Sequence, residues 1–250
     1  MDLQLAGRAY IITGGSRGLG YATARALVDE GAVVTISGRS EAGVENAVQQ
    51  LGGREQATGV VADTADSQTA AALVDATIKK FGRVDGAVLS AGGPPGGVTQ
   101  DISDTQWRSS FEATFLGPLR VAIAVGQVAA EGAAIGFVLS SSVRSPIPNL
   151  AVSNGLRPGL AMAAKTLADE LGPRGIRVFG LLPGRIDTDR TRELDSTDPQ
   201  RRKNAESTIP LRRYGEPAEF GRVAAFLISP LASYVTGVMV PIDGGALRAL

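Results

Sequence analysis

TGGSRGLG, at residues 13–20, follows an apolar run at 9–12 and opens a helical pattern that continues from about 21 to 30. A strand, a glycine turn and a helix in this order direct backbone N–H groups and a helix N-terminus at a phosphate. Gly14 permits the tight turn, Gly18 lets a pyrophosphate approach the backbone, and Gly20 lets the helix pack closely on its strand. The stretch therefore predicts a dinucleotide site made by Gly14, Ser16, Arg17, Gly18, Leu19 and Gly20.

The composition excludes several classes of function. The 250 residues suit one α/β domain or two small ones, and 25 Lys plus Arg balance 25 Asp plus Glu. A balanced charge favours neither nucleic acid nor an anionic membrane, so we expect neither partner. No apolar run approaches the roughly 20 residues of a membrane span, and no signal peptide is evident, so a cytoplasmic location is expected. The absence of cysteine and histidine removes disulfides, thiol catalysis, the usual general base and the commonest metal ligands.

The end of the second apolar run, at 32–37, favours NADP over NAD. An acidic residue near this strand end typically holds the ribose 2′-hydroxyl of NAD. This chain has Ser37, Gly38 and Arg39 there, with no carboxylate. Arg39 can form a charge-assisted fork with a 2′-phosphate, and Arg17 can approach the same group. We therefore expect NADP as the cofactor; the alternative is a pair of solvated surface arginines.

Strand and helix patterns alternate along the chain. Apolar runs at 59–61, 84–89, 133–139, 176–181 and 237–242 predict five more strands, and helices are expected over 41–51, 70–81, about 103–128, 160–171 and 216–228. A capping box at 103–106 begins the longest helix, and Gly117-Pro118 should kink it. The pattern predicts one α/β, doubly wound Rossmann-type domain over 1–250, with a central parallel sheet of about seven strands and helices on both faces. The highly charged segment 187–208 is expected to form a mobile substrate-side lid.

Several landmarks resemble those of the short-chain dehydrogenases/reductases. They are the glycine turn, Pro183-Gly184 with Thr188, and the segments at 215–217, 234–237 and 242–245. The sequence most resembles the bacterial 3-oxoacyl-carrier-protein reductase branch of this family. The resemblance implies an oxidoreductase for a small carbonyl or alcohol substrate, usually assembled as a homotetramer. It also implies cofactor contacts at Asp63, Ser90, Ala91, Gly92, Pro183, Gly184, Ile186 and Thr188. For Asp63 the alternative is to cap the next helix, with Asp66 and Ser67 as rival caps.

The catalytic pattern that the resemblance implies is largely substituted. Relatives use a tyrosine as proton donor, a lysine four residues later, a serine thirteen residues upstream of the tyrosine, and an asparagine on the long helix. Aligned backwards from LADEL at 167–171, the tyrosine position falls on Ser153 and the lysine position on Arg157. Ser140 keeps the serine, and Thr114 takes the asparagine position. One of the four catalytic residues is therefore retained.

Two hypotheses remain open for this site. Arg157 can donate to ribose hydroxyls but cannot exchange a proton near neutral pH. Ser140, Ser153 and Asn154 can polarise a carbonyl as an oxyanion hole does, or Ser153 and Asn154 merely cap the helix after Leu150. The first hypothesis is an NADP-dependent oxidoreductase in which water or a lid carboxylate replaces the tyrosine; those carboxylates are Asp187, Asp189 and Glu193. The second is a catalytically silent dinucleotide-binding regulatory or partner subunit.

Overall fold

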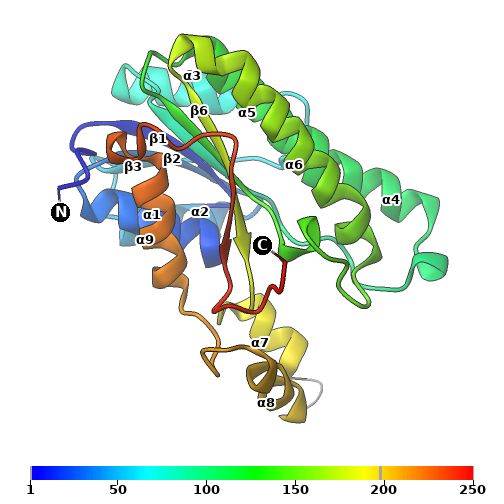
Figure 1. Cartoon of the computed structure of the whole chain (residues 1–250). Coiled ribbons are helices and arrows are strands. Elements are labelled where there is room, and N and C mark those ends of the chain that lie inside the picture. Colours follow the sequence, from blue (N-terminus) through cyan, green and yellow to red (C-terminus); the bar gives the residue numbers. More distant parts are fainter. Residues whose placement is uncertain (1, 197–198, 250) are drawn as a thin grey trace.

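A computed structural model describes residues 2–196 and 199–249, and within them the strands form one parallel sheet (Figure 1). Seven strands pair in the order β3-β2-β1-β4-β5-β6-β7. They are β1 (Ala9–Thr13), β2 (Val33–Gly38), β3 (Ala57–Val61), β4 (Gly86–Ser90), β5 (Ala134–Val138), β6 (Arg177–Pro183) and β7 (Met239–Ile242). The predicted fold class is confirmed. Continuous apolar runs form the five central strands, which are buried on both faces, whereas the edge strands β3 and β7 are partly exposed.

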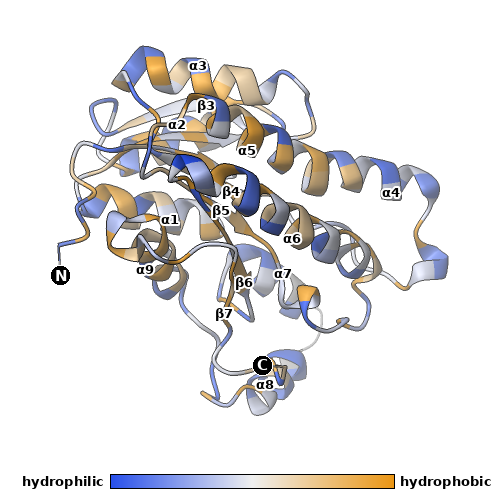
Figure 2. Ribbon diagram, turned by 45° about the horizontal axis from the view of Figure 1, so that its top comes forward, coloured by the Kyte–Doolittle hydropathy of each residue, from blue (hydrophilic) through white to orange (hydrophobic). Residues whose placement is uncertain are grey.

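Helices cover both faces of the sheet, and their apolar sides point inward (Figure 2). One face carries α1 (Gly18–Asp29), α2 (Glu41–Gln50) and α9 (Pro217–Ile228). The other carries α3 (Thr69–Phe81), α5 (Gly117–Val128) and α6 (Ala151–Leu171). After β1 the chain adds strands toward one edge of the sheet, and from β4 onward it adds strands toward the other edge, so the strand order reverses between β1 and β4. In sheets of this kind, ligands bind at the carboxyl ends of the strands beside this reversal point.

The long helix is interrupted near the predicted kink. Its first part, α4 (Asp104–Phe111), begins with the expected capping box between Ser103 and Gln106. A π turn at Glu112–Leu116 follows and leads into α5. Pro118 has no N–H to donate to the carbonyl four residues earlier, which accounts for the irregular turn at this point. Thr114, a predicted site residue, lies inside the π turn.

Helix α6 starts nine residues earlier than the sequence predicts. The predicted helix begins at 160, and the residues before it include Gly155, Pro158 and Gly159, which normally interrupt a helix. In the structure the two glycines make room for aromatic rings: a Cβ at Gly155 would lie 2.9 Å from the Trp107 ring, and one at Gly159 would lie 3.2 Å from Phe115. Close packing of α6 on the long helix therefore compensates for the poor helix formers.

The charged segment 187–208 lies outside the core, and the structure gives it two helices that the sequence analysis did not predict (Figure 1). They are α7 (Asp189–Asp195) and α8 (Pro199–Thr208), and residues 197 and 198 of this lid are outside the described residues. Buried Asp195 accepts a 3.0 Å hydrogen bond from the Tyr214 hydroxyl, and Arg202 lies 4.7 Å above the Tyr214 ring. Tyr214 therefore holds both lid helices.

The remaining helical elements are single turns: Thr99–Asp101, Ser141–Val143, Gly172–Arg174 and Pro230–Ala232. None of the helices within 2–196 and 199–249 has the length and apolar character needed to cross a membrane.

Candidate active site

The turn between β1 and α1 presents a helix N-terminus without a side-chain cap. Gly14 and Gly18 both have a φ of +59°. A Cβ at Gly20 would lie 2.3 Å from the Gly14 carbonyl oxygen, so the helix reaches its strand only because this residue is glycine. The N–H groups of Gly18, Leu19 and Gly20 have no acceptor among the described residues. Free N–H groups at a helix start fit the negative charge of a pyrophosphate.

The loops after β1, β4 and β6 converge at this turn. The Thr13 hydroxyl donates to the Ser90 carbonyl at 3.0 Å, and a Cβ at Gly14 would lie 2.6 Å from the same oxygen. On the other side, a Cβ at Gly18 would lie 4.0 Å from the Thr188 methyl group. The structure thus brings the predicted cofactor segments 14–20, 90–92 and 183–188 to one place at the carboxyl ends of the strands.

The β6 segment is held by its own hydrogen bonds. The Gly184 N–H donates to Ile242, and a Cβ at Gly184 would lie 2.6 Å from Asp243. The backbone carbonyl of the buried Ile186 accepts a 2.8 Å hydrogen bond from the Thr191 hydroxyl. Thr188 caps α7 by accepting from the Thr191 N–H. Pro183 through Thr188 therefore forms a fixed wall beside the glycine turn.

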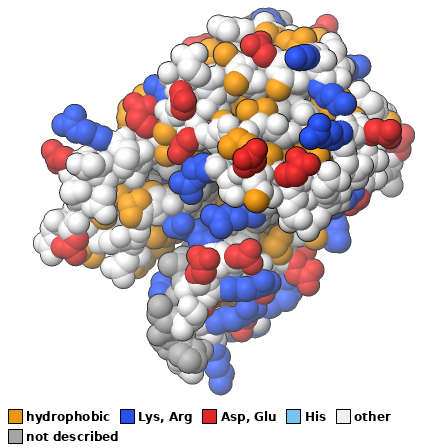
Figure 3. Space-filling model, turned by 180° about the vertical axis from the view of Figure 1, so that it is seen from behind, with side chains coloured by type: hydrophobic (Ala, Val, Ile, Leu, Met, Phe, Trp, Pro, Cys, Tyr) orange, Lys and Arg blue, Asp and Glu red, His pale blue; other side chains and the backbone are white. Residues whose placement is uncertain are grey.

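The end of β2 carries free positive charge. Arg17 and Arg39 are exposed, and neither has a hydrogen-bond or ion-pair partner in the described ranges. Ser16 lies against this strand end, because a Cβ at Gly38 would be 2.6 Å from its hydroxyl oxygen. Figure 3 shows Lys and Arg side chains gathered in the hollow between the body and the lid. The arrangement fits a phosphate better than a ribose diol.

Asp63, at the end of β3, does not cap a helix. Its carboxylate accepts from the Ala65 N–H at 3.0 Å, while α3 begins at Thr69 with Gln68 as an N-cap that makes no side-chain bond. Asp66 accepts from the Gln68 N–H and is likewise not the cap. The capping alternative is therefore wrong, since both carboxylates stabilise the turn before the helix instead.

The retained serine, Ser140, directly follows β5. It caps the single turn at Ser141–Val143 by accepting from the Ser142 N–H at 3.1 Å. Its hydroxyl proton has no acceptor among the described residues, and the side chain is partly exposed. Ser140 is therefore free to donate a hydrogen bond to a bound molecule.

Ser153, in the tyrosine position, is turned toward another serine. It is only 5% exposed, and its hydroxyl oxygen lies 3.0 Å from that of buried Ser142. Helix α6 begins at Ala151, so Ser153 lies inside its first turn and does not cap it. Asn154 does not cap it either, because its amide group pairs with both backbone groups of Ile147. The capping hypothesis is wrong, and no spacing rule in the sequence pointed to Ser142.

Arg157, in the lysine position, is buried against the end of β5. Its Nη1 donates to the carbonyls of Val138 and Leu139, the latter at 3.1 Å. Its Nε is buried with no acceptor in the described part of the chain. Burial lowers the pKa of Arg157 to about 10, and the charge of Arg190 adds to the effect. The side chain links α6 to β5, and no carboxylate in the described ranges pairs with its charge.

Thr114 and the lid carboxylates are engaged elsewhere. The buried Thr114 donates to the Ser110 carbonyl at 2.7 Å and makes no hydrogen bond to the serines. Burial alone would raise the pKa of Asp187, but Arg192 and Arg202 outweigh it and lower the pKa. Asp189 pairs with Arg192 at 3.4 Å, and Glu193 is exposed on α7. A carboxylate held by arginines is a poor proton donor, so Asp187 and Asp189 are unsuited to replace the tyrosine, and no contact among the described residues brings Glu193 to Ser140 or Ser153.

Arg190 is a site residue that sequence reasoning missed. It extends from α7 to the loop after β4, where its Nη2 donates to the Pro94 carbonyl at 3.0 Å. A Cβ at Gly93 would lie 2.8 Å from its guanidinium carbon, so the guanidinium rests on that glycine. The contact joins residues 96 apart in the sequence, and no local pattern could have indicated it.

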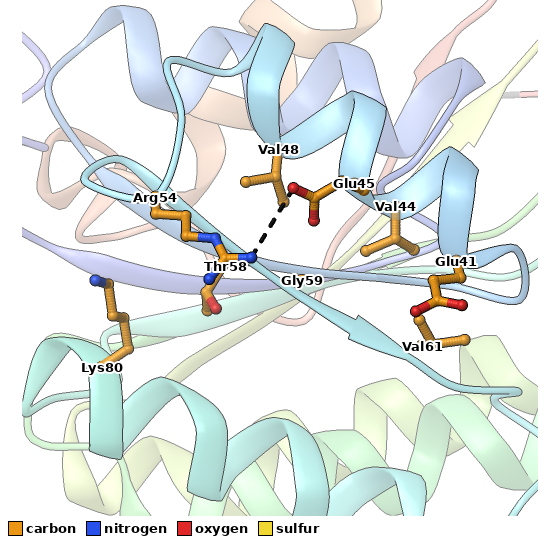
Figure 4. Close-up of a pocket in the computed structure, with 9 residues that line it drawn as sticks. All are labelled: Glu41, Val44, Glu45, Val48, Arg54, Thr58, Gly59, Val61 and Lys80. Carbon is orange, nitrogen blue, oxygen red and sulfur yellow. Dashed lines mark ion pairs between the residues drawn. The ribbon is translucent and has the colours of Figure 1, made fainter.

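A separate polar groove lies at the β3 edge of the sheet (Figure 4). Glu45 of α2 faces Arg54 across it at 3.9 Å, with Lys80 of α3 at one side. The groove contains none of the predicted site residues, and its charges are mixed. The strand-end site, where the predicted residues converge, therefore remains the candidate.

The strand order and the glycine turn define a Rossmann-type protein, and known proteins identify its family. A family model described as "Enoyl-(Acyl carrier protein) reductase" matches residues 14–246. Dehydrogenase/reductase SDR family member 4 of Homo sapiens is 33% identical over 245 residues, which cover 96% of this chain and 88% of that protein. The chain belongs to the short-chain dehydrogenase/reductase family.

Two further relatives are similar over the whole chain. Levodione reductase of Leifsonia aquatica is 34% identical over 257 residues, covering 97% of this chain and 95% of that protein. L-sorbose reductase from Gluconobacter frateurii, solved with NADPH and L-sorbose, has a TM-score of 0.93 and 27% identity, with all of both chains covered. These relatives are oxidoreductases by name. They support the family, while the branch within it is not assigned.

Proposed function

We propose that the protein is an NADP-dependent oxidoreductase that interconverts a carbonyl compound and an alcohol at the carboxyl ends of β4 to β6. The observation that carries the proposal is the uncapped start of α1 beside two unpartnered arginines, Arg17 and Arg39. NAD-specific members of this fold place a carboxylate at the end of β2, and this chain has none there. The related L-sorbose reductase was solved with NADPH, which is consistent with this choice.

Different residues of the site would contact different parts of the cofactor. The glycine turn with Ser16 would hold the pyrophosphate, and Arg17 with Arg39 the 2′-phosphate. Asp63 would lie beside the adenine, and the segments at 90–92 and 183–188 would enclose the nicotinamide end. Arg157 lies behind that end, with Nη1 occupied by β5 carbonyls, so a ribose contact falls to its remaining donors.

Ser140 is the group that acts on the substrate. When bound, NADPH supplies a hydride to the carbonyl carbon, and the resulting alkoxide must take up a proton. The free hydroxyl of Ser140 donates a hydrogen bond to that oxygen as it gains negative charge. Ser153 does not assist, because its hydroxyl is paired with Ser142. Water reaches the partly exposed Ser140 and supplies the proton.

This site should work slowly. Loss of a general acid costs a factor of about 10² to 10⁴ in rate, or roughly 3–5 kcal/mol of barrier. Ser140 retains only the hydrogen-bonding part of the usual apparatus, and the paired lid carboxylates add no acid. We therefore expect weak turnover that is limited by the chemical step.

A second candidate function is a silent dinucleotide-binding subunit. The observation in its favour is that Arg157 and Ser153 both bond to the protein itself, as residues of structural value do. A crystal structure with NADP distinguishes the two. An ordered nicotinamide with its reactive carbon facing Ser140 supports the oxidoreductase. An ordered adenine with a disordered nicotinamide supports the silent subunit.

A further inference from the structure

Two guanidinium groups lie at the substrate end of the site without a carboxylate. Arg157 is 6% exposed, and within the described residues its side chain donates only to the carbonyls of Val138 and Leu139. Arg190 bonds the Pro94 carbonyl and no acid in the described residues. The other arginines of the lid differ, because Arg192, Arg201 and Arg202 each pair with an aspartate or glutamate.

The topology places these two groups side by side. Ser90 at the end of β4 pairs with Val138 at the end of β5, so the loops that follow are neighbours. Arg190 rests on Gly93 in the first loop, while Arg157 reaches Leu139 in the second. The charge of Arg190 also contributes to lowering the pKa of Arg157, as expected for cations close together. Both side chains therefore reach the neighbouring loops that follow β4 and β5, and Ser140 opens the second of these loops.

Two like charges at such a site are unfavourable until an anion binds. A buried charge without a counter-ion is costly, and the Nε of Arg157 has no acceptor in the ranges that the structure describes. The lid carboxylates closest to Arg190 in sequence are occupied: Asp189 pairs with Arg192, and Asp187 pairs with Arg192 and Arg202. The cofactor phosphates are assigned elsewhere: the pyrophosphate to the glycine turn, and the 2′-phosphate to Arg17 and Arg39. The missing negative charge is thus left to the substrate.

We infer that the substrate is a small oxo acid whose carboxylate is held by Arg190, with the buried positive charge of Arg157 behind it, while its carbonyl oxygen meets Ser140. This inference names the substrate class for the proposed function and rests on it. A carboxylate is planar and matches the fork of a guanidinium, and the Pro94 carbonyl is the one acceptor that the described residues offer to the five donors of Arg190. A neutral ketone would leave the buried charge of Arg157 uncompensated, whereas water solvates the exposed Arg190.

Binding to the protein saturated with NADP⁺ tests the inference without turnover, because the oxidised cofactor carries no hydride. The probes are acetoacetate and methyl acetoacetate, which share the ketone and differ in the charge. One charge-assisted interaction predicts that calorimetry finds the acid bound at least about tenfold more tightly than the ester. The same titrations on the protein without NADP⁺ show whether the preference needs the cofactor.

Arg190→Ala should abolish the preference for the acid and leave NADPH affinity unchanged. Lys203→Ala is the matched control, because it removes one exposed positive charge from the same lid and should keep the preference. Arg190→Lys should keep part of it, since a lysine retains the charge but not the fork. Equal binding of acid and ester by the wild type overturns the inference. So does a preference that survives Arg190→Ala, or a tenfold loss of NADPH affinity in that variant without any change in the preference.

The outcome also separates this inference from the proposed function. If the acid is preferred in binding but no NADPH is oxidised, the carboxylate site stands and the reductase proposal fails. If acid and ester are reduced at equal rates, reduction stands and the carboxylate site fails. A preference for dihydroxyacetone phosphate over dihydroxyacetone, without one for acetoacetate, would replace the carboxylate by a phosphate and overturn the oxo acid.

Discussion

Arg39→Ala should remove most of the discrimination between NADPH and NADH. In the structure Arg39 is exposed and has no partner among the described residues, so its removal breaks no contact of the folded protein. One charge-assisted fork to the 2′-phosphate contributes about 1.5–3 kcal/mol, and solvent exposure puts Arg39 at the low end of that range. We therefore expect the Kd for NADPH to rise about tenfold and the Kd for NADH to stay constant.

The assay is fluorescence titration of both cofactors with the wild type, Arg39→Ala and a control. Arg54→Ala is a suitable control, because Arg54 is 79% exposed and its one ion pair, to Glu45, is 3.9 Å long. Added salt should weaken NADPH binding more than NADH binding, since the additional interaction is between exposed charges. Equal affinities in the wild type, or a preference unchanged by Arg39→Ala, would refute the reasoning.

Three further predictions concern stability and assembly. Tyr214→Phe leaves the buried Asp195 without its 3.0 Å hydrogen-bond donor, so the variant should lose about 1–3 kcal/mol of folding free energy and exchange amide hydrogens faster in α7 and α8. Unchanged exchange in these helices would show that Tyr214 does not hold the lid. Hydrogen bonds from Arg213 and the Glu216 N–H lower the pKa of Glu219 from 4.5 to about 2. The contribution of Glu219 to stability is therefore present above about pH 4.5 and is lost as the pH falls toward 2. Glu219→Gln should flatten the dependence of Tm on pH in that window, and an unaltered dependence would count against this role. Exposed apolar residues on α5 and α9, Ile123, Val128 and Phe226, favour a homotetramer, which a monomeric mass by light scattering at micromolar concentration would disprove.

The fold could be predicted because its signals are local. Each strand is a short apolar run, and the capping box of α4 and the glycine turn are each formed by residues that lie close together in the sequence. The lid helices could not be predicted, because α8 has scarcely any apolar side to give a helical period. The early start of α6 could not be predicted, because Gly155 and Gly159 are poor helix formers and their packing against Trp107 and Phe115 is visible only in the structure.

The candidate site was predicted where position along the chain fixes geometry. Ser140 and the segments 14–20 and 183–188 follow strands of a parallel sheet, so they had to meet at its carboxyl edge. The partners of individual side chains were beyond the sequence: Ser153 turns to Ser142, and Arg157 turns to β5 carbonyls. Arg190 was missed for the same reason, since its target loop is 96 residues away.

The central claim is that this protein reduces a carbonyl with NADPH through Ser140, and turnover of purified protein tests it most directly. NADPH oxidation is followed with activated ketones, 3-oxoacyl thioesters and oxo acids, for the wild type, Ser140→Ala and the neighbouring control Ser141→Ala. We predict slow oxidation by the wild type, a loss of about 10²-fold or more in Ser140→Ala, and no such loss in the control. With no histidine in the chain and no tyrosine in the site, we also predict no pH optimum set by a group of pKa roughly 6 to 8. No NADPH oxidation above background despite NADPH binding, or full activity in Ser140→Ala, would contradict the claim.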